Sequence, residues 1–156
     1  MVTFAQSAFP PLALGFFGLG TGYLIYGPQE LFGWPRRDNP VDRGAGIWGI
    51  WLPGFCQLVT GLILFVGLTW LQVFTATPPL YMAALAFSAY GIHWFAIGWN
   101  RAHGNDPRIN AGMAVAFMVI SAMGATVFST CRTGRSVSCS SGCSPSTSAT
   151  SSPRSV

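Results

Sequence analysis

No charged side chain interrupts residues 44–100, which read GAGIWGIWLPGFCQLVTGLILFVGLTWLQVFTATPPLYMAALAFSAYGIHWFAIGWN. A bilayer hydrocarbon core about 30 Å thick is crossed by ~20 mainly apolar helical residues. These 57 residues therefore hold two crossing helices. The cluster from Thr75 to Pro79 predicts the turn between them, and Pro53 predicts a kink or a later start of the first.

The 12 charged residues gather outside such runs. Six lie in residues 30–43 and three in residues 101–108, whereas residues 1–29 and 109–131 carry none. These two further runs predict one crossing helix each, the first stopped by Gly27-Pro28. Residues 29–43 are then expected to form a loop or an interfacial segment. The four predicted spans are residues 10–26, 46–71, 80–99 and 109–128.

Composition supports a polytopic membrane bundle of the all-α class. Hydrophobic residues make up 51% of the 156 residues and charged residues 8%, against roughly a quarter charged in soluble domains. The N-terminus up to Phe9 has no Lys or Arg, so we expect a retained span and not a cleaved signal. All eight basic residues are scattered arginines, a pattern that does not favour nucleic-acid binding.

The chain divides into a transmembrane domain, residues 1–131, and a tail, residues 132–156. Ten of the 25 tail residues are serine, and none is aromatic. Such a composition cannot bury a core and predicts disorder. A shifted reading frame after the fourth span is the alternative interpretation of the abrupt change.

Several polar side chains fall within the predicted spans. Gln57 needs hydrogen-bond partners that lipid cannot supply, so interhelical bonding and pore lining both remain open. His93 either lines a pathway or makes a helix contact. His93 and His103 are too far apart along a helix to share a metal, and Cys139 and Cys143 lack nearby histidines. No catalytic motif occurs, so we predict no enzyme, no metal site and no cofactor.

Three sequence blocks resemble the acetate uptake transporter family of bacterial succinate-acetate permeases and fungal acetate transporters. Residues 11–21, PLALGFFGLGT, resemble the family's Asn-Pro-Ala-Pro-Leu-Gly-Leu opening and the Phe-Gly-Met-Thr-Thr run after it. Residues 55–62, FCQLVTGL, are similar to its second helix. Residues 86–94, AFSAYGIHW, resemble Ala-Phe-x-Ser-Tyr-Gly-x-Phe-Trp, with His93 in place of the second Phe. The matching motif residues are Pro11, Leu12, Leu14, Gly18, Gly91 and Trp94.

The resemblance implies uptake of a small carboxylate such as acetate or succinate, with a proton as partner, by a homo-oligomer, a hexamer, in the plasma membrane. Phe17 and Tyr90 match positions of the family's hydrophobic constriction. Family members have six membrane helices, whereas four are predicted here. The polar candidates for the substrate path are Gln57, Ser88, His93 and Thr21.

Other interpretations stay open beside the transporter. A truncated, non-transporting remnant or a scaffold subunit fits four helices equally well, and a haem-binding bundle would need histidines paired across helices. Arginines concentrate in loops on the inner side of a membrane. Five arginines lie in residues 29–43 and 100–108, on the side opposite the N-terminus, so the arginine count places the N-terminus outside. The resemblance places the N-terminus inside.

Overall fold

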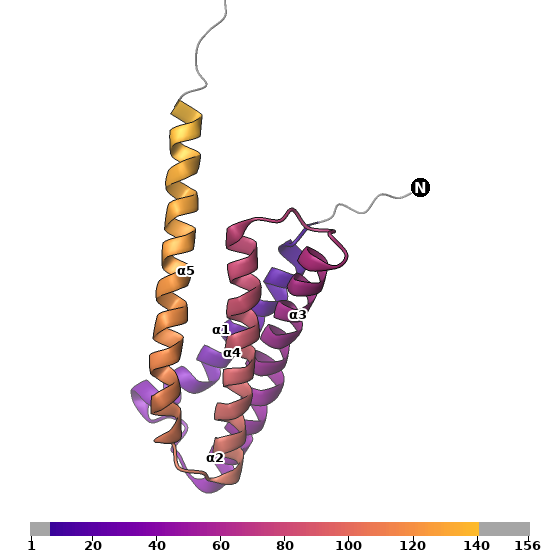
Figure 1. The fold of residues 1–156 in the computed structure, drawn as a ribbon. Helices are drawn as coiled ribbons and strands as arrows, with labels where there is room; N and C mark the ends of the chain where they lie inside the picture. Colours follow the sequence, from indigo (N-terminus) through magenta and orange to yellow (C-terminus); the bar gives the residue numbers. More distant parts are fainter. Residues whose placement is uncertain (1–6, 141–156) are drawn as a thin grey trace, which may run out of the picture.

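The computed structural model describes residues 7–140, with side chains as far as Arg132, and all of its regular elements are helices (Figure 1). Three consecutive segments join into one helix of 31 residues, so four helices are long and apolar enough to cross a membrane. This confirms the predicted fold class for the described residues. The elements are α1 Phe9–Phe32, α2 Asn39–Gly49, the π-helical η1 Ile50–Gly54, α3 Phe55–Thr69, α4 Pro78–His103 and α5 Ile109–Ser140.

Helix α1 continues beyond its predicted end. Gly27-Pro28 was expected to stop the helix, but Pro28 lies inside it, and the true end is Gly33 in a left-handed conformation, φ 66°. The Gly33 amide donates to the Gln29 carbonyl at 3.1 Å, and the Trp34 amide donates to the Pro28 carbonyl at 3.3 Å. An interior proline removes one helical hydrogen bond and crowds the carbonyl four residues earlier, yet α1 continues for one more turn to the glycine cap.

The expected loop at residues 29–43 is correspondingly shorter, because α2 begins at Asn39. The Asp38 side chain caps α2 by accepting from the Val41 amide at 2.9 Å. Pro53 produces no break: the helix widens into the π-helical turn η1 and continues as α3. A π-helical turn thus stands at Pro53, where tilt, a kink or a later start was expected, and the predicted start at residue 46 is seven residues too late.

The last two helices begin close to their predicted starts. Thr77 is extended before the prolines that open α4, and Gly104, φ 67°, ends α4 in a left-handed cap. Helix α5 begins at Ile109 as expected and continues to Ser140, past the predicted end at residue 128. Residues 132–140, assigned to a disordered tail from sequence, are therefore helical here, and the remaining tail residues lie outside the described part.

The packing is uneven. Helices α3 and α4 lie side by side, α1 crosses behind them, and α5 stands apart from the upper half of the bundle (Figure 1). The core of buried residues lies between α3 and α4, with Leu12 of α1 packed against it. The buried core residues are Leu64, Leu68, Ala84 and Phe87.

Candidate functional site: an apolar groove beside Gln57

One groove in the bundle is lined by rings and methyl groups around a single amide. It has a volume of about 300 Å³ and lies between α1, α4 and α5, with α3 contributing one residue, Gln57. The lining residues are Phe16, Leu19, Tyr23, Gln57, Ala83, Ala86, Phe87, Tyr90 and Phe128.

Gln57 is the polar centre of this groove. Its side chain is 1% exposed, and its Nε2 has no hydrogen-bond partner among the described residues. A buried amide donor without a partner costs roughly 1–3 kcal/mol. The neighbouring Thr60 is satisfied by donating to the Pro11 carbonyl at 2.8 Å. Gln57 therefore presents two N–H donors to a ligand that can accept them.

Tyr90 stands at the edge of the groove and joins α4 to α5. Its hydroxyl lies 2.6 Å from the Ser121 hydroxyl, and Ser121 lies 2.8 Å from the Phe117 carbonyl. A carbonyl only accepts, so the single Ser121 proton goes to Phe117 and Tyr90 donates to Ser121. The Tyr90 proton is thus committed to α5. Gln57 is then the buried free donor beside the groove, since the other hydroxyl of the lining belongs to Tyr23, whose side chain is 60% exposed.

The two adjacent phenylalanines in the middle of α1 are placed differently from the expectation. Phe17, expected beside Tyr90 at a constriction, is 58% exposed and does not line the groove. Phe16 lines it instead and packs edge-to-face on Phe87, with ring centroids 5.2 Å apart. Consecutive helical residues are turned by about 100°, so only one of the pair can face α4.

The other polar candidates lie away from the groove. Thr21 donates within α1, 2.9 Å from the carbonyls of Phe17 and Gly18. The buried Ser88 hydroxyl faces Gly61 of α3 and has no partner among the described residues.

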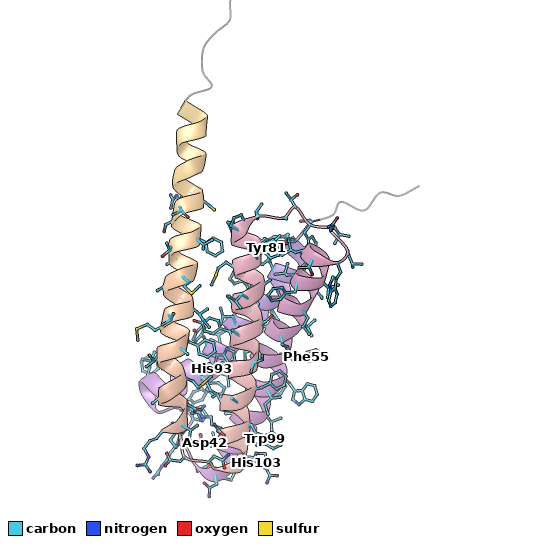
Figure 2. All side chains as sticks on the ribbon, viewed as in Figure 1. Asp42, Phe55, Tyr81, His93, Trp99 and His103 are labelled. Carbon is cyan, nitrogen blue, oxygen red and sulfur yellow. The ribbon has the colours of Figure 1, made fainter. Side chains whose placement is uncertain are left out.

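His93 lies between α4 and α5 (Figure 2), where its ring centroid is 4.2 Å from that of Phe117. Its Nδ1 is buried without a described partner. The structure thus brings together Gln57 and Tyr90, but not Thr21, Ser88, His93 or Phe17.

Most of the motif residues hold helices together. A Cβ on Gly91 would lie 2.5 Å from the Leu58 amide nitrogen, and one on Gly18 would lie 2.6 Å from the Cys56 Cβ. The Trp94 ring packs edge-on against Tyr26, with centroids 5.1 Å apart. Pro11 and Leu12 contact α3 and the core, and Leu14 is 37% exposed.

A cluster of polar and charged side chains that the sequence did not predict connects the end of α1, the start of α2 and the end of α4. Arg101, its side chain 9% exposed, bonds Glu30 at 2.8 Å and the Gln29 side-chain oxygen at 3.2 Å. Arg37 bonds Glu30 at 3.3 Å and Asp42 at 3.2 Å. We call these five residues the arginine network. The contacts of Arg101 with Gln29 and Glu30 join residues about 70 positions apart, so no local sequence pattern reveals them.

Comparison of the chain with protein-family models, with curated protein sequences and with solved structures finds no match.

Proposed function

We propose that this chain is a multi-pass membrane protein that conducts small carboxylates, acetate or succinate, through the groove beside Gln57. The observation that carries the proposal is the buried Gln57 Nε2, which has no partner among the described residues and faces a space lined by apolar rings. Lipid offers no acceptor for such a donor. A carboxylate has two acceptor oxygens and a short apolar body, and so complements both the amide and the rings.

The dimensions of the groove support a small substrate. A volume of about 300 Å³ is at the lower end of ligand pockets, so it suits a compact anion better than a large organic molecule. No cation lines the groove, so binding would be weak enough for release, as conduction requires. The resemblance of the three blocks to acetate uptake transporters supports the same substrate class.

Three further parts of the proposal rest on that resemblance: proton coupling, a hexameric assembly and the plasma membrane. An assembly also agrees with the poor burial of α5, of whose apolar stretch 6% is buried against 39% for α2–α3. Packing between copies would cover part of that surface.

The test is uptake of labelled acetate at pH 6 into vesicles that contain the full chain, with and without a proton uncoupler. We expect saturable, uncoupler-sensitive uptake. Gln57→Leu removes the donor at similar volume and should raise the half-saturating concentration about tenfold, as loss of a hydrogen bond to a charged group does. Gln72→Leu, in the segment between α3 and α4, removes an amide far from the groove and is the matched control.

Equal uptake by wild type and Gln57→Leu would overturn the role of the groove. No uptake from a well-inserted chain would favour the second candidate, a non-transporting scaffold subunit. The observation that favours this candidate is again the exposed length of α5, which offers surface for other membrane helices.

A further inference from the structure

A polar hollow lies at the opposite end of α4 from its proline start. It has a volume of about 550 Å³ and is formed where the end of α4, the start of α2 and the start of α5 meet. Asp42 and His103, labelled in Figure 2, lie at this end of the molecule. We call it the arginine pocket, after Arg37, Arg43 and Arg101 in its wall.

Exposed tryptophans place this end at the boundary of the membrane. Trp48 of α2 is 57% exposed and Trp99 of α4 is 58% exposed, and Trp34 in the preceding loop is 71% exposed. Tryptophans concentrate at the level of lipid head groups. The arginine pocket therefore opens where phosphate groups of lipids lie.

The charges of the pocket leave one cation without compensation. Arg37 and Arg101 are balanced by Glu30 and Asp42 within the arginine network. Arg43 makes neither an ion pair nor a hydrogen bond with any residue that the structure describes. Its guanidinium retains all five N–H donors for a ligand.

Neutral donors surround this cation. Four asparagines line the pocket, two from α4 and the turn after it and one each from α2 and α5. The Asn100 amide donates to Asn110 at 3.1 Å, and the Asn105 amide donates to Asn100 at 3.1 Å. Each of these amides keeps a second N–H, and Asn39 has no described partner.

We propose that the arginine pocket binds a phosphate group, with Arg43 as its principal ligand and an anionic phospholipid as its source. Guanidinium and phosphate match in bidentate geometry, which favours phosphate over a simple halide. The volume exceeds that of inorganic phosphate or a small carboxylate and suits a head group with its glycerol. Basic pockets between membrane helices at this depth bind anionic lipids in the same way.

The experiment measures lipid retention by the full chain with native mass spectrometry. The chain is released from bilayers of phosphatidylcholine that contain a minor fraction of phosphatidylglycerol. Wild type should retain phosphatidylglycerol in preference to phosphatidylcholine. Arg43→Gln should weaken this retention at least tenfold, as the loss of a hydrogen bond to a charged group does.

Arg36→Gln is the matched control, because it removes the same charge from an exposed residue of the loop before α2 that does not line the pocket. It should change retention less than twofold. Equal weakening by the two variants, or no preference for phosphatidylglycerol in wild type, would overturn the proposal. Circular dichroism of both variants checks that their helices remain intact.

A separate arm identifies the source of the phosphate. Inorganic phosphate at millimolar concentration is added to the chain in pure phosphatidylcholine, and bound phosphate is counted for wild type and Arg43→Gln. If inorganic phosphate binds to wild type but not to Arg43→Gln, the site binds phosphate and its ligand is soluble phosphate, not a lipid. Its absence, beside retention of phosphatidylglycerol, assigns the site to the lipid.

Discussion

Helices α3 and α4 are in close backbone contact, whereas α5 contacts α4 through scattered side chains and is 6% buried along its apolar stretch. Between α3 and α4, Gly61 and Gly91 let the two backbones approach, so a Cβ at Gly91 would strike the Leu58 backbone. In α5, Gly112 has nothing within 4 Å of its Cβ position, and Gly124 meets only the flexible end of Met82 at 3.5 Å. Small residues permit close packing, but a complementary partner surface must be present to use them.

The largest effect is expected from placing a methyl group in the tight interface. Gly91→Ala should destabilise the chain by about 1–3 kcal/mol, the usual cost of overpacking, because the Leu58 backbone cannot move aside alone. Gly112→Ala adds the same methyl group to the open face of α5 and should be neutral or slightly stabilising, since alanine favours helix. Thermal unfolding in one detergent compares the two. Similar losses for both variants would contradict the contrast drawn between these helices.

The number of spans follows from the sequence, and their ends do not. Charge-free runs locate all four described helices that are long and apolar enough to cross a membrane, because hydropathy is a local property. The charged segment at residues 29–43 was expected to be a loop or an interfacial segment, but two of its carboxylates, Glu30 and Asp42, pair with Arg101 of α4. Such pairing depends on the tertiary structure, so a local pattern could not reveal that helices enter this segment from both sides.

The residues of the candidate site could be predicted from the sequence only where a local property marks them. Gln57 stood out because an amide in an apolar run is costly anywhere in a membrane. The choice between Phe16 and Phe17 depends on how α1 is rotated, which is set by the contact of Gly18 with Cys56 and Pro53. The resemblance pointed to Phe17, and only the packed structure places Phe16 in the groove.

The different positions of Phe16 and Phe17 relative to the groove can be tested directly. Phe16→Ala should widen the groove, alter the rate of acetate uptake and cost about 1 kcal/mol through the lost ring pair with Phe87. Phe17→Ala should leave both the uptake rate and the pairing unchanged. Initial rates and thermal unfolding are measured on the two variants in parallel. A larger effect on uptake from Phe17→Ala would return the constriction to the position implied by the resemblance.

A smaller effect is expected from the polar contact that holds α5 against α4. Tyr90→Phe and Ser121→Ala each remove the 2.6 Å hydrogen bond and should cost about 1 kcal/mol. Because both changes break the same bond, their costs should not add, and a double-mutant cycle should return a coupling of about 1 kcal/mol. Chemical denaturation of the four proteins measures this coupling. Fully additive costs would mean that the two side chains act independently.

The smallest effect concerns the turn that leads into α5. The Asp106 carboxylate accepts from the Arg108 side chain, with Nε at 3.0 Å, and from the Arg108 amide at 2.9 Å. Hydrogen bonds from the Arg108 side chain first, and from its backbone second, lower the pKa of Asp106 below its ordinary value. The carboxylate form is therefore the one favoured by the folded turn.

A lowered pKa in the folded state stabilises the turn above the unfolded pKa, near 3.9, and this contribution is lost as the pH falls through the folded value. Full exposure of Asp106 keeps the effect small. We expect hydrogen exchange at the amides of residues 109–111, corrected for its intrinsic pH dependence, to lose protection as the pH falls below about 4. Asp106→Asn should remove this pH dependence, because its amide does not titrate. If the pH dependence persists in Asp106→Asn, another group causes the loss of protection, and the ion pair between Asp106 and Arg108 does not stabilise the start of α5.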